Sequence, residues 1–157
     1  ALHSNFDDPF LHRTAIELFD AATLRPVRRF AGTAEQFARG LFFPDGRRAL
    51  TFGESVPVRV WDVATGRVEP RYDGHRAGPG LVAVDRTGAT VATADHRHAV
   101  CVWDGRTGRL VRRFDRPRFA TLAVTPDGRT VLAAGWPAAV WLTPADGGER
   151  TAVSRVH

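Results

Sequence analysis

The amino-acid sequence predicts an all-β fold assembled from repeated sets of short antiparallel strands. Two phrases of ten residues, VRVWDVATGR at 58–67 and VCVWDGRTGR at 100–109, are nearly the same and lie 42 residues apart. Apolar residues alternate with a period of two along these phrases, as expected of strands in a pleated sheet. No apolar stripe is sustained at the helical period outside a short turn around 34–38. Repetition of this kind favours an architectural role over a catalytic one.

Three further sets of residues support the same period. Two sets repeat every 42 residues, namely the aspartates Asp20, Asp62 and Asp104, and the aromatic residues Phe30, Tyr72 and Phe114, each preceded by an arginine. The third set is Gly46, Gly88 and Gly128, and its last interval is 40 residues. A loop that differs in length between units accounts for this difference of two residues.

Each complete unit reads as four short strands separated by turn residues. In the unit at 38–73, the apolar run GLFF leads into the turn Pro44-Asp45-Gly46, which favours a chain reversal. Its second, third and fourth strands are predicted in RRALTF, VRVW and RVEPRY, at 47–52, 58–61 and 67–72. Valine-rich segments such as VRVW suit a pleated sheet.

The same order of strands and turns is predicted in the next two units. The third unit reads LVAV, ATVATA, VCVW and RLVRRF, and the fourth reads TLAV, RTVLAA, AVWL and ERTAV. The first unit starts at its second strand, ALHS, and continues through the polar loop NFDDPFLHR to AIELF. The chain is therefore predicted to hold three complete units and one partial unit.

Four short strands per unit, with Trp-Asp closing the third strand, resemble the blades of the WD40 repeat family, which form β-propellers. The expected blades lie at 1–33 (partial), 37–73, 79–115 and 118–154. Propellers usually have about 4–8 blades, and a blade needs neighbours on both faces. The sequence also lacks an initiator methionine. We therefore expect an incomplete ring or part of a larger one, with blade faces that pair with a second copy or with the remaining blades.

The resemblance implies a hydrogen-bonded network inside a blade. In this family a histidine after glycine, a threonine or serine on the second strand and the tryptophan of the third strand are linked through a loop aspartate. The third unit offers His75, Thr93 and Trp103, while Asp95 lies two residues before the family's aspartate position, which Arg97 occupies. The intact pairs Trp61-Asp62 and Trp103-Asp104 complete the predicted structural set. The other units are expected to lack the network altogether and to depend on apolar packing.

The resemblance further implies a non-catalytic scaffold that binds a protein or peptide through loops on one rim, and in bacteria with GC-rich genomes such blades often accompany signalling domains. All 22 basic residues are arginine, which is consistent with a GC-rich genome. Loops on a rigid scaffold commonly carry binding residues, and arginine and aromatic residues are frequent binding hot spots. The candidate rim residues are Glu54, His96, Arg97, His98, Arg116, Arg118 and Trp136.

Two other classes of function remain open. The net charge of +5 and the pI of about 11.0 would attract nucleic acid or another acidic partner, although the arginines are scattered along the chain. An enzyme is the third alternative, but no Gly-x-Ser-x-Gly motif and no phosphate-binding glycine motif is present. We therefore expect no catalytic activity.

No metal, cofactor or membrane contact is predicted. His96, His98 and Cys101 lie within six residues, but no second group of ligands follows at a zinc-binding spacing. Cys101 falls inside a predicted strand. The sequence has no secretory signal pattern and no apolar run of the length that spans a bilayer. These features, with a single cysteine, are compatible with a cytoplasmic location.

Overall fold

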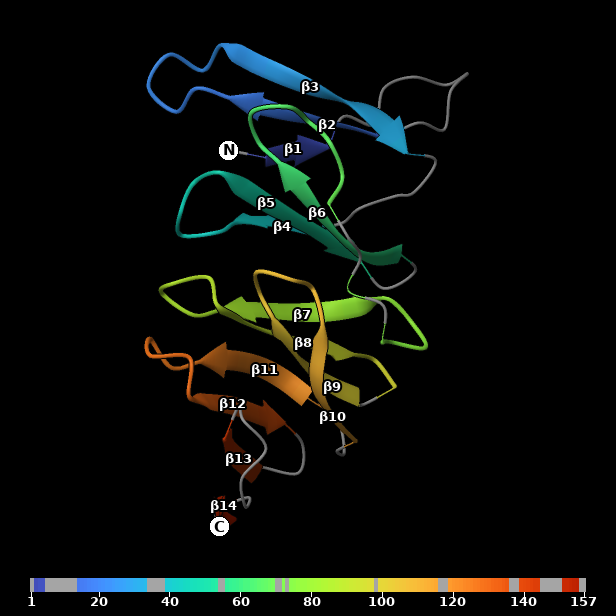
Figure 1. Cartoon of the computed structure of the whole chain (residues 1–157). Coiled ribbons are helices and arrows are strands. Elements are labelled where there is room, and N and C mark those ends of the chain that lie inside the picture. The colour runs from blue at the N-terminus through green and yellow to red at the C-terminus, as the bar shows by residue number, and fades with distance from the viewer. Residues whose placement is uncertain are drawn as a thin grey trace.

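A computed structural model describes the backbone of residues 2–4, 14–33, 39–53, 56–69, 72, 74–97, 99–115, 119–135, 139–144 and 151–155. These residues form fourteen strands and no helix, and the strands build four antiparallel sheets that follow one another along the chain (Figure 1). The all-β fold predicted from the repeat is therefore confirmed.

The order of strands in space follows their order in the sequence within every sheet. The first sheet contains β1 (Leu2–Ser4), β2 (Thr14–Phe19) and β3 (Pro26–Thr33), and the second contains β4 (Arg39–Phe42), β5 (Arg48–Gly53) and β6 (Val56–Asp62). The third sheet contains β7 (Pro79–Val84), β8 (Thr90–Asp95), β9 (Ala99–Asp104) and β10 (Leu110–Asp115). The fourth contains β11 (Phe119–Val124), β12 (Thr130–Gly135), β13 (Ala139–Pro144) and β14 (Thr151–Arg155).

The fourth strand predicted in the second unit is not a continuous ladder in the described residues. Two isolated bridges take its place, pairing Val58 with Tyr72 and Trp61 with Val68. The sequence between the bridges includes Pro70, which has no N–H to donate to a neighbouring strand. The chain still returns along β6, so Tyr72 reaches the position that an outer strand would give it.

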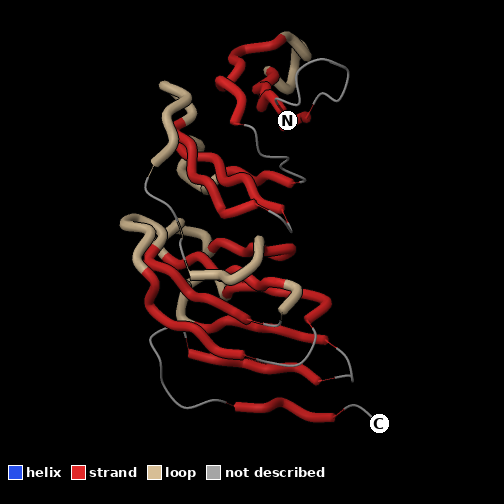
Figure 2. The backbone as a smooth tube through the Cα atoms, turned by 90° about the vertical axis from the view of Figure 1, so that its right-hand side faces the viewer, coloured by secondary structure: helices blue, strands red, loops and turns tan. Residues whose placement is uncertain are grey.

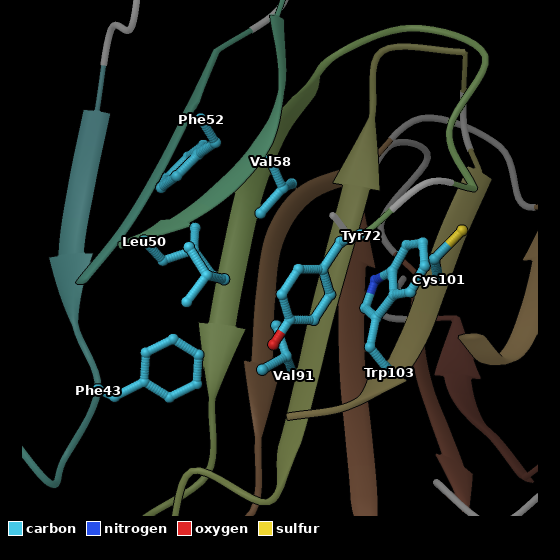
Figure 3. Close-up of a cluster of buried hydrophobic side chains, with 9 residues drawn as sticks. Phe43, Leu50, Phe52, Val58, Tyr72, Val91, Cys101 and Trp103 are labelled. Atoms are coloured by element: carbon cyan, nitrogen blue, oxygen red, sulfur yellow. The ribbon is translucent and has the colours of Figure 1, made fainter. Parts of the chain in front are cut away.

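The sheets stack as successive layers, and apolar side chains fill the seams between them (Figure 2). The seam between the second and third sheets is the largest, with nine buried residues that include Leu50, Val58, Tyr72 and Trp103 (Figure 3). Alternate residues of one strand serve different seams. On β9, Trp103 faces the second sheet, whereas Val102 packs toward the fourth. This arrangement explains the period of two in the sequence.

An aromatic residue after the third strand of each sheet packs on the tryptophan of the next sheet. Phe30 stacks on Trp61, with ring centroids 5.5 Å apart and planes inclined by 9°. Tyr72 meets Trp103 edge to face, with centroids 5.4 Å apart and an angle of 78°. Both pairs span 31 residues of sequence. The repeated aromatic residues therefore connect neighbouring sheets, and each pair adds to the energy of area burial alone.

The repeated Trp-Asp phrase also shapes a turn. Asp62 Oδ1 accepts hydrogen bonds from the backbone N–H and the hydroxyl of Thr65, each at 2.6 Å. Asp104 Oδ1 accepts the backbone N–H groups of Arg106 and Thr107, each at 2.9 Å. An aspartate that satisfies the N–H groups two and three residues ahead stabilises a tight reversal.

These turns and the shorter turns that follow β4, β7 and β11 lie on one edge of the sheets, here called the turn edge (Figure 1). The opposite edge, here called the linker edge, carries the segment 74–78 before β7 and the β8–β9 turn at 96–97 (Figure 1).

Candidate interaction site

The linker before β7 is fastened to the third sheet by a chain of polar side chains. His75 Nδ1 lies 3.0 Å from Asp95 Oδ2, and His75 Nε2 lies 2.5 Å from Thr93 Oγ1. Thr93 Oγ1 also accepts the indole N–H of Trp103 at 2.8 Å. The structure thus brings together the four residues that the sequence suggested for the network.

One assignment of protons satisfies every member of this chain. Trp103 can only donate, so Thr93 accepts from it and donates its own hydroxyl proton to His75 Nε2. His75 is then neutral and donates from Nδ1 to the Asp95 carboxylate. Burial lowers the pKa of His75, which agrees with the neutral ring. Burial alone would raise the pKa of Asp95, but hydrogen bonds from the Ala99 N–H and from His75 outweigh it, and the pKa lies below its ordinary value.

Glycine is required before this histidine because the Trp103 ring lies against the backbone. A Cβ atom at Gly74 would lie 2.5 Å from Trp103 Cη2. The Gly-His dipeptide therefore combines a close approach of backbone to indole with a histidine that reaches the second strand of the sheet.

Part of the network is present in the second sheet as well. The Trp61 indole N–H donates to Thr51 Oγ1 at 2.8 Å, and both side chains are buried. The expectation that the other units lack the network altogether is therefore wrong for this sheet. The sequence shows the reason, since Thr51 and Trp61 have the same spacing of ten residues as Thr93 and Trp103.

A groove of about 590 Å³ opens beside this linker, where the second and third sheets meet. Its lining comes from the start of β6, from the linker and from β10. The lining residues are Val56, Pro57, Val58, Tyr72, Gly74, His75, Arg76, Ala77, Gly78, Pro79 and Arg113. Most of these side chains are apolar, and Val56, Val58, Tyr72 and Pro79 are buried.

Arginine supplies the charge of the groove. Arg113 Nη1 donates to the Gly74 carbonyl at 2.5 Å, and Arg113 Nη2 lies 3.6 Å from Asp115 Oδ1. Arg76 is exposed and forms no ion pair with the residues that the structure describes. Arg39 crosses the seam and donates to the Gly80 carbonyl at 2.7 Å.

Arg113 therefore does more than place a charge on an outer strand, which is how the arginine before each repeated aromatic residue was interpreted. Its counterpart Arg29 is mostly exposed and lies 3.7 Å from Glu17. Arg71 lies outside the described residues. Sequence reasoning missed the groove, because its residues come from separate units. Arg76 directly follows the Gly-His dipeptide, and this position was the only signal for it.

Of the predicted rim residues, the structure describes two. His96 and Arg97 form the β8–β9 turn on the linker edge, and both are exposed. The other five, Glu54, His98, Arg116, Arg118 and Trp136, lie outside the described residues. The predicted rim set thus remains a prediction.

The short run of histidines and Cys101 does not gather into a metal site in the described part of the chain, where no cluster of three potential ligands occurs. Cys101 is buried on β9, and its thiol lies 3.8 Å from the Gly74 carbonyl oxygen. Burial raises the pKa of this thiol to about 12, so it carries a proton at neutral pH.

Sheets of four antiparallel strands, stacked in sequence order, define the chain as a segment of a β-propeller. One similar solved structure is the Myceliophteria thermophila Cps50 (Swd1) beta-propeller domain, with a TM-score of 0.69 and 17% sequence identity. The match covers 79% of this chain and 41% of that one, so the chain spans less than half of the domain it resembles. No family profile and no curated protein sequence matches this chain. The described residues contain no helix able to cross a membrane.

Proposed function

We propose that this chain is a non-catalytic scaffold that binds a protein or peptide partner along its linker edge. The observation that carries the proposal is the groove at the seam of the second and third sheets. Its walls are rigid, because the network of His75 holds the linker to β8 and β9 while apolar packing holds β6. Rigid concave sites with few, well-placed polar groups are favoured for binding.

The predicted rim residues extend this surface. His96 and Arg97 follow Asp95, which is bonded to His75, so the β8–β9 turn and the linker belong to one edge. We propose that Glu54, His98, Arg116, Arg118 and Trp136 contribute further contacts on that edge. A role in assembling bacterial signalling complexes, at a cytoplasmic location, is consistent with such a scaffold.

Nucleic acid is the second candidate, and the turn edge weighs against it. Arginines are frequent there, but every turn also carries an aspartate close by in the sequence. The pairs are Asp20 with Arg25, Asp45 with Arg47, Asp62 with Arg67, Asp85 with Arg86, Asp104 with Arg106 and Asp127 with Arg129. Neighbouring carboxylates offset the arginine charges that a phosphate backbone would need to contact.

Photo-cross-linking tests the proposed edge. A benzoylphenylalanine at Arg97 places the reactive group on the linker edge, and the same residue at Arg106 is the matched control on the turn edge. Both positions are exposed turns of the third sheet. With a pool of short peptides of varied sequence, we expect attachment at position 97 and little at position 106. Equal attachment at both positions, or none at either, would refute the proposal.

A further inference from the structure

We infer that the groove between the second and third sheets binds an acidic peptide segment that also carries an apolar side chain. This inference rests on the proposed function and names the class of partner for that scaffold. It depends on the shape of the groove, on the chemistry of its walls and on the sign of the charges at its edge.

The walls select an apolar group. Val56 and Val58 come from β6, and Pro79 begins β7, so a group in the groove would contact two sheets at once. The volume of about 590 Å³ lies within the usual range of ligand sites and exceeds the space that one side chain fills. A short peptide segment therefore fits better than a single buried residue.

The charges select carboxylates. Two arginines, Arg76 and Arg113, line the groove, and none of its lining residues is acidic. Arg113 is held by the Gly74 carbonyl and partly balanced by Asp115, which leaves Arg76 as the cation most open to a ligand. Complementary charge at the edge of an apolar site steers a partner of opposite sign and fixes its register.

A peptide explains this combination better than a polynucleotide does. Binding to a phosphate backbone draws on a row of cations along an exposed surface. Here the cations flank an apolar recess, and the linker beyond them continues with Ala77, Gly78 and Pro79. Such a surface suits an apolar side chain flanked by Asp or Glu.

Fluorescence anisotropy with defined probes tests the inference. The probe is a labelled peptide of alternating Leu and Glu, and the comparison probes are Leu-Gln and Ser-Glu peptides of equal length and a single-stranded oligothymidine. We expect the Leu-Glu peptide to bind most tightly. Arg76→Gln should weaken its binding about fivefold, as loss of one exposed charge pair implies. Ala77→Glu, which places a negative charge in the groove, should weaken it further.

Arg106→Gln removes an equally exposed arginine from the turn edge and should leave binding unchanged. Circular dichroism of each variant verifies that the fold is kept. If the Leu-Glu peptide binds but neither Arg76→Gln nor Ala77→Glu changes its affinity, the groove inference is wrong while the scaffold proposal stands. Tighter binding of the oligothymidine, lost in Arg76→Gln, would also overturn the inference. Absence of any peptide binding, together with no cross-linking at position 97, would refute both.

Discussion

At the scale of single residues, one position in the first unit departs from the pattern that its repeats follow. The turns after the third strands of the second and third units end at Gly66 and Gly108, with φ of 72° and 69°. The equivalent position, 42 residues before Gly66, is Leu24, with φ of 55°. A left-handed backbone is unfavourable for a residue with a Cβ atom, and Leu24 is also largely exposed, so its side chain gains little from packing.

Leu24→Gly should therefore stabilise the protein. Relief of the left-handed strain exceeds the added freedom of glycine in the unfolded chain, and we expect a gain of about 0.5–1 kcal/mol in the free energy of unfolding. Urea denaturation followed by tryptophan fluorescence measures this gain. Gly66→Ala is the matched opposite change, because it adds strain and brings a Cβ to within 2.6 Å of Phe30. Loss of stability in Leu24→Gly would contradict this account of the turn.

The residues of the polar network show how far sequence reasoning reaches at this scale. His75, Thr93 and Trp103 are recognisable because they occupy fixed positions in a repeated pattern. The role of Asp95 depends on the exact path of the β8–β9 turn, where Asp95 Oδ1 also accepts the Ala99 N–H at 3.0 Å. A turn path of this kind is set by tertiary contacts and not by the pattern of apolar residues. Arg97, at the family's aspartate position, is exposed instead.

At the scale of elements, the strands and their turns could be predicted and the seams could not. Alternating valines and Asp-Gly turns identify β5, β6, β8 and β9 from local sequence alone. The groove requires β6, the linker and β10 to meet, and their residues are separated by up to 57 positions, from Val56 to Arg113. The broken fourth strand of the second unit was also missed, because Tyr72 follows the aromatic repeat although the ladder is interrupted before it.

The attachment of the linker to β8 makes the stability of this sheet depend on pH. His75 is neutral in the folded chain and its pKa lies below 6.5, the ordinary value that the unfolded chain keeps. As the pH falls below about 6.5, the unfolded chain binds a proton that the folded chain does not, so stability decreases until the folded-state pKa is reached. Asp95 acts in the same direction at lower pH, since its folded-state pKa lies below 3.8.

We expect the free energy of unfolding to fall between about pH 7 and pH 5, and to fall less in His75→Gln. Urea unfolding at a series of pH values gives the slope for each protein. His96→Gln is the matched control, because His96 is exposed, and it should keep the slope of the unaltered chain. The same slope in His75→Gln and in the unaltered chain would contradict a neutral, buried His75.

At the scale of the whole molecule, the two outer faces of the stack differ in chemistry. The first sheet turns Glu17 and Arg29 away from the second sheet, and the two side chains pair with each other. On the fourth sheet, the described side chains that face away from the third are uncharged, namely Thr121, Ala123, Leu132 and Ala134. An uncharged sheet face in contact with water favours association.

We predict that the chain self-associates through the face of the fourth sheet. Leu132→Glu places a charge on that face and should weaken association at least about tenfold, because an unpaired charge is costly in an apolar interface. Sedimentation over a range of concentrations gives the association constant. Val27→Glu is the control, since Val27 is exposed on β3 of the first sheet, and it should leave association unchanged. A monomer at every concentration would refute the prediction.

The aromatic pairs that join neighbouring sheets bear on how such a molecule changes in size. Phe30 and Tyr72 stand at equivalent positions, and each meets a tryptophan 31 residues further along the chain. If an in-register recombination event removed the 42 residues from 31 to 72, Phe30 would occupy the place of Tyr72 and would face Trp103. Duplication of the same stretch would likewise supply each new tryptophan with an aromatic neighbour. The unit of inheritance therefore straddles two blades, and blades are gained or lost one at a time without orphaning a ring.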